Sequence, residues 1–186
     1  TTRFMDQYLI EHCSPTLASL KTANLFNYTF QSEYELKEHI QNLNASLGNK
    51  GISVTILHKT TTSALIYVYR EKKLCKDLSD PEASSILGEA GYTDCSPSAA
   101  LEHLRMRFRK GDSFPHEIGL FLGYPPGDVT GYIQNHGRNS KCSGCWKVYC
   151  DECEAVKTFN RFNKCKSLYK SMFHQGKTIC QLTVAI

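Results

Sequence analysis

The stretch GISVTILHKTTTSALIYVYR, residues 51–70, decides the fold class of this chain. Its first half alternates apolar side chains with others, at Ile52, Val54 and Ile56. Its second half contains ALIYVY, a continuous apolar run typical of a buried strand. Because only the polar segment HKTTTS connects the two, we expect residues 52–57 and 63–69 to form an antiparallel β-hairpin. A hairpin as the clearest strand pair favours an α+β fold over a doubly wound parallel sheet.

Helical spacing predicts the elements around this hairpin. Ser32 is placed to cap a helix over 32–47, with Glu35 three residues later as its capping-box partner. Pro15 is expected to close an earlier helix over 3–12. Further helices are expected over 71–78, over 80–90, from Pro97 onward, as two short pieces within 114–136, and as one long helix over 152–175.

Other segments predict additional strands. TLASLKTANLFNY, residues 16–28, fits either a strand or an extended loop, and WKVYC, residues 146–150, fits a short strand. KTICQLTVAI, residues 177–186, alternates its apolar residues and predicts a final strand. We therefore expect a single domain over 1–186, in which helices cover a small, mainly antiparallel sheet made of the hairpin and C-terminal strands.

The composition is that of a packed soluble protein, with 41% hydrophobic and 22% charged residues. No apolar run approaches the roughly 20 residues of a membrane-spanning helix, and the polar first residues predict no secretory signal. We therefore expect no membrane association. The net charge of +4 is small for a nucleic-acid-binding protein, and the basic cluster RMRFRK, residues 105–110, fits a solvated helix face better.

Cysteine usage points to a reducing compartment. The chain has nine cysteines, and an odd number argues against a closed disulfide framework. Several lie in predicted helix or strand interiors, where a free cysteine behaves as a small hydrophobic residue. We therefore expect reduced thiols and a cytoplasmic protein. The cysteines are at positions 13, 75, 95, 142, 145, 150, 153, 165 and 180.

Three stretches carry a family resemblance. They are HCSPTLASLKTANLF at 12–26, FPHEIGLFLGYPPGDVTGYIQNHG at 114–137 and GCWKVY at 144–149. In this order they resemble the DUF3793 family, uncharacterised proteins of clostridia and related anaerobes. The resemblance covers nearly the whole chain. It implies a small cytoplasmic protein without an established activity, connected with iron or redox metabolism and with a flavodoxin-like redox partner.

The first candidate site combines a thiol with an imidazole. His12 and Cys13 follow a predicted helix, and Lys21 lies eight residues further on. A nearby cation lowers the pKa of a thiol, as a nucleophile or a metal ligand requires. If His116 faces Cys13, the two form a thiolate–imidazolium pair, and Glu117 orients the ring or complements a helix dipole. A buried structural cysteine with a capping histidine is the alternative.

The second candidate is a metal site in KCSGCWKVYCDEC, residues 141–153. Each Cys-x2-Cys pair has the ligand spacing of zinc or iron–sulfur sites. The four residues between the pairs are far fewer than the usual 15–20 of zinc ribbons, so a single ion would need a tight bend there. The resemblance implies that the family pattern does not require these cysteines. The candidate ligands are Cys142, Cys145, Cys150 and Cys153.

Aromatic residues of the same stretches suggest a third candidate. Tyr124, Trp146 and Tyr149 could line a pocket for a flat ligand such as a flavin, a haem or a nucleotide, although packing between elements is the favoured explanation of them. Residues 116–137 have the lengths of a helix–turn–helix. Their second helix offers no arginine or lysine for DNA, which makes nucleic-acid binding the weaker interpretation.

Three classes of function therefore remain open, and whether the protein is an enzyme stays undecided. The first is a protein of iron or redox metabolism that binds iron, zinc, haem or a flavin-type ligand through His12, Cys13 and His116. The second is a cysteine-dependent enzyme that uses Cys13 as nucleophile with His116. The third is a nucleic-acid-binding module.

Overall fold

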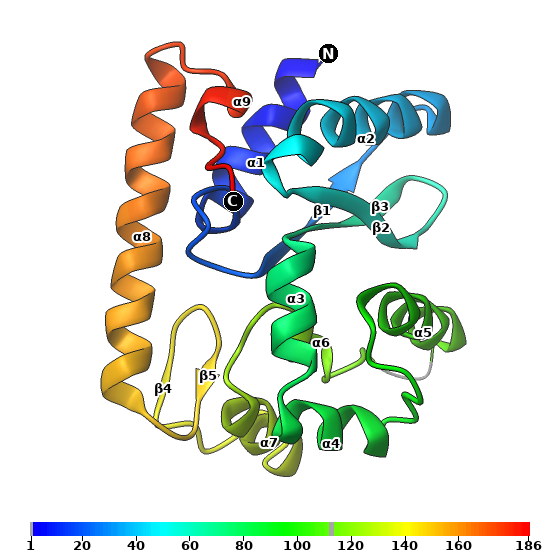
Figure 1. The fold of residues 1–186 in the computed structure, drawn as a ribbon, viewed down its shortest axis with the longest axis vertical. Coiled ribbons are helices and arrows are strands. Elements are labelled where there is room, and N and C mark those ends of the chain that lie inside the picture. Colours follow the sequence, from blue (N-terminus) through cyan, green and yellow to red (C-terminus); the bar gives the residue numbers. More distant parts are fainter. Residues whose placement is uncertain (1, 112–113) are drawn as a thin grey trace. The chain divides into compact units, whose positions relative to one another are not determined.

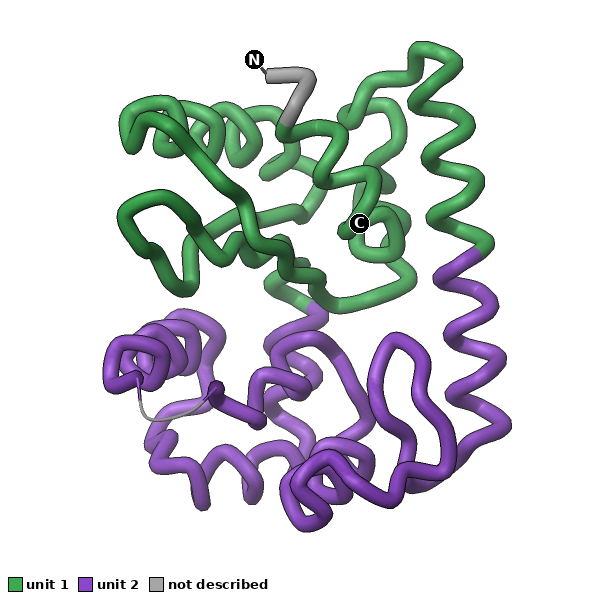
Figure 2. Tube along the Cα trace, turned by 180° about the vertical axis from the view of Figure 1, so that it is seen from behind, with its two compact units in different colours: residues 1–72, 164–186 green, residues 73–163 purple. Residues whose placement is uncertain are grey.

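The computed structural model describes residues 2–111 and 114–186, which divide into two compact units (Figures 1 and 2). Unit 1 contains residues 1–72 and 164–186, and unit 2 contains residues 73–163. The prediction of one domain over 1–186 stays a prediction. The fold class is confirmed as α+β, with small antiparallel sheets packed among helices.

The sheet of unit 1 has three antiparallel strands in the order β1-β3-β2. They are β1 (Ala23–Thr29), β2 (Ser53–Lys59) and β3 (Ser63–Tyr69). The hairpin prediction is confirmed, because β2 and β3 pair antiparallel, with a bulge between Ile56 and His58. The segment 16–28, which fitted either a strand or a loop, begins in the last turn of the first helix and ends in β1, which pairs with the other edge of β3.

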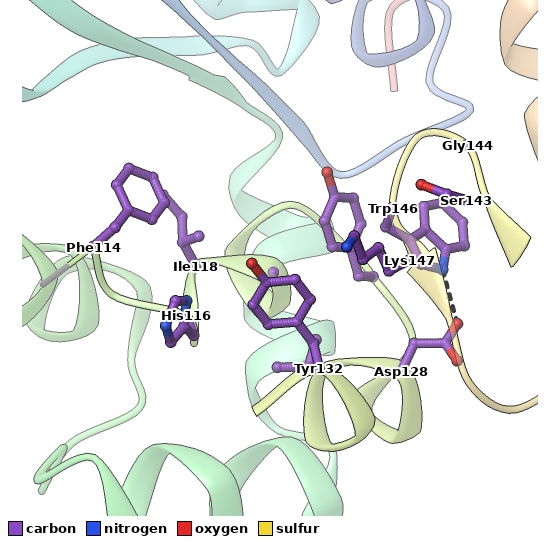
Figure 3. Close-up of a pocket in the computed structure, with 12 residues that line it drawn as sticks. Phe114, His116, Ile118, Asp128, Tyr132, Ser143, Gly144, Trp146 and Lys147 are labelled. Carbon is purple, nitrogen blue, oxygen red and sulfur yellow. Dashed lines mark hydrogen bonds between the residues drawn. The ribbon is translucent and has the colours of Figure 1, made fainter. Parts of the chain in front are cut away.

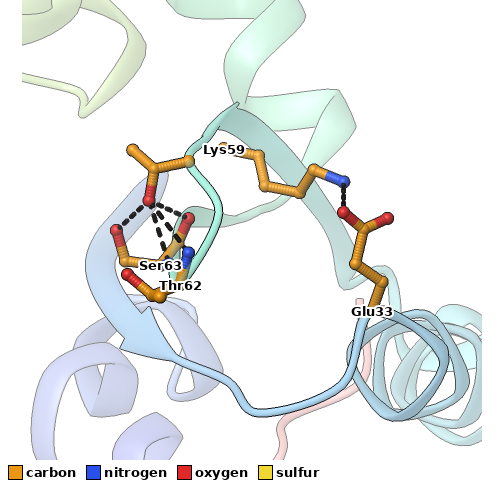
Figure 4. A network of polar contacts seen from close by, with 5 residues as sticks. Glu33, Lys59, Thr62 and Ser63 are labelled. Atoms are coloured by element: carbon orange, nitrogen blue, oxygen red, sulfur yellow. Dashed lines mark hydrogen bonds and ion pairs between the residues drawn. The ribbon is translucent and has the colours of Figure 1, made fainter.

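Polar contacts fix the β2–β3 turn and the adjacent edge of the sheet (Figure 4). The Thr60 hydroxyl accepts hydrogen bonds from the backbone N–H groups of Thr62 and Ser63, at 3.3 and 3.0 Å. Lys59 Nζ lies 2.7 Å from Glu33 Oε1 and so connects the end of β2 to the start of the preceding helix, at Glu33. These groups are exposed, so we expect the ion pair to add at most about 1 kcal/mol.

Helices cover one face of this sheet and build the core of unit 1. They are α1 (Thr2–Leu17), α2 (Glu33–Leu47), the 3-10 turn η1 (Gly48–Lys50), the end of α8 (Glu152–His174) and α9 (Ile179–Leu182). Ser32 caps α2 as predicted, because its hydroxyl accepts from the Glu35 N–H at 3.4 Å. The core side chains include Leu9, Leu17, Phe26, Leu36, Leu47, Val54, Ile66, Val68 and Tyr169.

Two predictions about unit 1 are wrong. Pro15 lies inside α1, which continues to Leu17. A proline removes only one donor, and burial of Cys13 and Leu17 in the core outweighs that loss. The segment 177–186 contains no strand, and its residues Ile179–Leu182 form the helix α9. Thr178 and Gln181 make a capping box there, a local signal that the apparent alternation of apolar residues concealed.

Arg70, directly after β3, joins several segments of unit 1. Its side chain is fully buried and donates to four backbone carbonyls. Nε bonds the carbonyl of Thr16 at 2.8 Å and Nη1 that of Lys50 at 3.0 Å. Nη2 bonds the carbonyls of Leu17 and Val184, at 2.8 and 2.7 Å. The guanidinium thus replaces its lost hydration with fixed acceptors and holds the C-terminal segment against the end of α1.

Unit 2 consists of short helices and a two-stranded hairpin. Asp80 caps its helix α4 by accepting from two backbone N–H groups, as the sequence predicts. The elements are α3 (Glu71–Leu78), which begins at the unit boundary, α4 (Pro81–Glu89), α5 (Pro97–Lys110), α6 (Ile118–Phe121), α7 (Pro126–Gln134), β4 (Cys142–Ser143) and β5 (Lys147–Val148). No helix in the described ranges is long and apolar enough to cross a membrane.

The long helix expected over 152–175 is confirmed as α8 (Glu152–His174). Its residues up to 163 belong to unit 2, and those from 164 belong to unit 1. Val156, which the spacing places inward, is 42% exposed, and Ala155 is buried in its place. The same spacing places further residues inward, of which Met172 and Phe173 are half-buried and the others are buried: Phe159, Phe162, Cys165 and Tyr169.

Candidate functional site

A pocket of about 290 Å³ lies in unit 2, walled by α6, α7 and the β4–β5 hairpin (Figure 3). Most of its wall is apolar, and aromatic rings dominate it. Figure 3 shows Phe114, His116 and Tyr132 toward one end and Trp146, Ser143 and Gly144 toward the other. The lining residues are Phe114, His116, Ile118, Gly119, Tyr124, Asp128, Val129, Tyr132, Ser143, Gly144, Trp146 and Lys147.

Ring contacts hold the aromatic walls in place. The rings of Tyr124 and Trp146 stack with their centroids 5.0 Å apart, and the Trp146 ring meets Phe159 edge-on at 4.6 Å. The Tyr124 hydroxyl donates to the carbonyl of Cys145 at 3.1 Å, and burial raises its pKa to about 12. The rings of His116 and Tyr132 lie against each other with their centroids 5.2 Å apart. These contacts give most of the aromatic rings in the wall a packing partner.

Asp128, in the first turn of α7, holds the Trp146 hairpin. Its side chain is 3% exposed and accepts three hydrogen bonds. Oδ2 accepts from the indole Nε1 of Trp146 at 2.8 Å, drawn as a dashed line in Figure 3. Oδ1 accepts from the backbone N–H groups of Tyr149 and Cys150, at 2.8 and 2.9 Å. One carboxylate thereby sets the orientation of the indole ring in the pocket wall.

Two glycines permit this close packing. A Cβ atom at Gly131 of α7 would overlap the ring of Tyr149, and one at Gly144 would overlap the ring of Phe159. Neither neighbour is the free end of a flexible side chain. The requirement is therefore for space, and these glycines let the hairpin lie directly on α7 and α8 within unit 2.

The polar groups of the pocket are few. Lys147 is exposed, and its Nζ donates to the carbonyl of Gly137, which uses one of its three donors. His116 is also exposed. Because the Asp128 carboxylate is occupied by three donors, the groups left to bind a ligand are aromatic faces, one ammonium group, one imidazole and the hydroxyls of Ser143 and Tyr132.

Glu117 lies next to His116 but does not line the pocket. Its buried carboxylate forms an ion pair with Arg107, whose Nε and Nη2 lie 2.8 and 3.3 Å from its two oxygens. The hydroxyl of Tyr92 also donates to it, at 3.1 Å. Burial raises the pKa of Tyr92, as does the Glu117 charge, and the Glu117 hydrogen bond raises the pKa of Arg107. Glu117 therefore has the contacts of a residue that stabilises the fold, and its side chain makes no capping hydrogen bond at the start of α6.

The comparison with protein families agrees with the resemblance seen in the sequence. The family described as "Protein of unknown function (DUF3793)" matches residues 9–183, which span parts of both units. The chain belongs to the DUF3793 family. No curated protein and no solved structure matches it.

In this DUF3793 protein, the residues of the thiol site belong to different units. Cys13 and Lys21 are buried in unit 1, and His116 is in unit 2. The Cys13 side chain has no exposed surface, and burial raises the pKa of its thiol although Lys21 partly offsets this. These features describe an inert core thiol better than a nucleophile. The shared site of Cys13 and His116 stays a prediction.

His12 has the environment of a packing residue at the surface of unit 1. Its ring is exposed and stacks on Phe26, with the centroids 5.6 Å apart. Tyr8 contacts it at 5.9 Å. Burial lowers the pKa of its imidazole, which therefore favours the neutral form. Its role as a cofactor-binding residue stays a prediction.

The cysteine quartet follows the β4–β5 hairpin without forming a metal cluster. Cys142 pairs with Val148 across the strands, and Cys142 and Cys145 pack against the small core around Phe159. Partial desolvation and acidic neighbours raise the thiol pKa of Cys142 and Cys150, and both Cys150 and Cys153 are exposed. Across residues 2–111 and 114–186, no group of three His, Cys, Asp or Glu side chains is arranged to hold a metal ion.

Sequence patterns predict part of this pocket and leave other lining residues unmarked. Tyr124 and Trp146 were predicted to line a pocket and do so, but Tyr149 does not. Its ring packs on Gly131 and its hydroxyl donates to the Arg138 carbonyl. The residues missed are Phe114, Asp128, Tyr132 and Lys147, all of which lie within or beside the motifs that carry the resemblance. The single turn of α6 is shorter than the helix–turn–helix interpretation requires.

Proposed function

We propose that this protein binds a small planar heteroaromatic anion, of the flavin or nucleotide type, in the pocket of unit 2. The observation that carries the proposal is a pocket walled by Trp146, Tyr124 and Tyr132, with the ammonium group of Lys147 at its edge. Aromatic side chains bind flat ring systems through their faces, and a lysine supplies the counter-charge for a phosphate or carboxylate.

The size of the pocket limits the ligand. Its volume of about 290 Å³ lies at the lower end of the roughly 300–1,000 Å³ typical of ligand sites. That space suits one ring system, with the anionic substituent directed toward Lys147. His116 would complete the polar contacts as a donor or acceptor to the ring.

A flavin-type ligand would give the protein its role in redox metabolism. We extend the proposal to a cytoplasmic protein with a flavodoxin-like redox partner, as the family resemblance implies. The free thiols of all nine cysteines, each of which lies in the described ranges, support a reducing compartment.

The emission of Trp146 tests the proposal directly, because it is the only tryptophan of the chain and lines the pocket. Flavin mononucleotide, riboflavin, adenosine monophosphate and haem are titrated separately, and both tryptophan emission and ligand fluorescence anisotropy are followed. We expect saturable quenching by flavin mononucleotide or by the nucleotide, and weaker binding of riboflavin, which lacks the phosphate. No saturable change with any of these ligands at millimolar concentration would overturn the proposal.

Matched variants separate the pocket from the rest of the surface. Lys147→Met should weaken flavin mononucleotide binding about fivefold, the equivalent of one exposed charge contact, and should leave riboflavin unchanged. Lys164→Met removes an exposed lysine outside the pocket and should change neither affinity. Tyr132→Leu should weaken both ligands, whereas Tyr34→Leu, at a side chain that is 75% exposed in unit 1, should weaken neither.

A further inference from the structure

A second pocket, of about 300 Å³, lies within unit 1 between α1, α2 and the segment that begins α9. It shares no residue with the pocket of unit 2. Apolar side chains form part of it and polar ones the remainder. The lining residues are Met5, Asp6, His39, Asn42, Leu43, Ser46, Thr178, Ile179 and Cys180.

The imidazole of His39 is the feature that calls for a ligand. The side chain is 8% exposed, and its Nδ1 atom is buried without a hydrogen-bond partner. Among the side chains of residues 5–111 and 114–186, it is the one buried nitrogen or oxygen atom without a partner. Buried polar atoms in native proteins are nearly always paired, so an orphan atom at a pocket wall requires an explanation.

Asp6 supplies the charge of this pocket. Its carboxylate is half-buried, and burial raises its pKa, an effect that His39 partly offsets. Among the lining residues it is the one acid, and neither lysine nor arginine lines the pocket. A ligand that pairs with Asp6 therefore carries a positive charge, and an anionic ligand would be repelled.

The remaining lining residues define the body of the ligand. Met5, Leu43 and Ile179 are buried hydrophobic side chains that favour an aliphatic segment. The exposed rim carries Asn42 and Thr178, which can bind polar substituents. A metal ion is not the occupant that this arrangement favours, because no cluster of three ligating side chains exists in the described part of the chain.

We propose that the pocket of unit 1 binds a small organic cation, a primary ammonium group on a short aliphatic body. The ammonium group has three donors, which suits a carboxylate and an unpaired imidazole nitrogen at once. Asp6 accepts one donor, and Nδ1 of the neutral His39 imidazole, which keeps its proton on Nε2, accepts another, while Met5, Leu43 and Ile179 contact the aliphatic body. This inference is independent of the function proposed for unit 2.

Cys180 provides the readout, because it lines the pocket, is exposed and has its Sγ 4.0 Å from the Ser46 carbonyl oxygen. The full chain is alkylated with iodoacetamide at constant ionic strength, and modification of each cysteine is followed by peptide mass spectrometry. The probes are n-butylammonium chloride, 1-butanol and sodium butyrate at equal concentrations. The exposed Cys75 and Cys153 serve as internal references.

We expect n-butylammonium to slow alkylation of Cys180 severalfold without changing Cys75 or Cys153, and we expect butanol and butyrate to have little effect. In Asp6→Asn, the same protection of Cys180 should need about ten times more n-butylammonium, which is the usual effect of losing a charge-assisted contact. Glu38→Gln, an exposed acid on α2 outside the pocket, should leave it unchanged.

Three outcomes would overturn the proposal. The first is that butanol protects Cys180 from alkylation as well as n-butylammonium does. The second is that no probe protects Cys180 at concentrations up to the order of 100 mM. The third is that n-butylammonium protects Cys180 in Asp6→Asn as well as in the wild type. The wild-type comparison of the three probes needs no variant, so it decides even if Asp6→Asn folds poorly. Loss of flavin or nucleotide binding in unit 2 would leave this result unaffected, because the two pockets have no residue in common.

Discussion

Replacing Asp128 should destabilise the β4–β5 hairpin, which carries Trp146. Asp128→Ala removes the acceptor of three hydrogen bonds, from the Trp146 indole and from the backbone N–H groups of Tyr149 and Cys150. A hydrogen bond to a charged group contributes about 1.5–3 kcal/mol. Three such bonds would set an upper limit of about 4.5–9 kcal/mol if they were additive and fully buried.

The expected cost is smaller because water can reach part of this network. Trp146 and Tyr149 are half-buried and Cys150 is exposed, so water replaces some of the lost contacts. We therefore expect Asp128→Ala to lower the free energy of unfolding of unit 2 by about 3 kcal/mol. Asp128→Asn keeps one oxygen for the two backbone donors but turns an NH₂ group toward the indole, so about half that loss is expected.

Urea denaturation followed by tryptophan emission measures this effect, since Trp146 alone reports and lies in unit 2. The emission of folded Asp128→Ala should also shift to longer wavelength, because the indole loses its fixed partner. Glu89→Gln, at an exposed acid of the same unit, should change stability by less than about 0.5 kcal/mol. An Asp128→Ala protein as stable as wild type would refute the view that this carboxylate holds the hairpin.

Three further predictions concern unit 1. Arg70→Met should lower the free energy of unfolding by about 3 kcal/mol or more, because four backbone carbonyls lose a buried partner. Thermal denaturation followed by circular dichroism measures this loss. An Arg70→Lys protein as stable as wild type would contradict the explanation. Cys13 should resist alkylation in the folded protein and react only after denaturation, since its thiol is buried and its pKa is raised. Asp6→Asn should raise the melting temperature at pH 7 and change it little below about pH 4. Burial raises the pKa of Asp6 in the folded state, so the wild-type protein loses stability as pH rises from the pKa of the unfolded state to that of the folded state, and asparagine avoids this loss. A difference in melting temperature that does not depend on pH would show that burial of the charge is not the cause.

Local sequence signals determined much of the fold of this protein. The hairpin of β2 and β3 followed from two short apolar segments with a polar connection, because strands this close in the sequence pair directly with each other. The starts of α2 and α4 followed from Ser32 and Asp80, because a capping side chain contacts backbone N–H groups only two or three positions away. The aromatic motif residues Tyr124 and Trp146 were recognisable as pocket candidates from their stretches alone.

Tertiary structure decided the features that depend on contacts between distant segments. Pro15 could not stop α1 once the following turn was buried, and the alternating C-terminal residues became α9 because Ile179 and Leu182 fit the core of unit 1. The sequence around Arg70 does not indicate which carbonyls accept from its side chain, and one of them, that of Val184, is far from it along the chain. Its role, like that of the unpaired His39 nitrogen, arises because burial removes water and makes each polar group depend on whichever part of the chain packs against it.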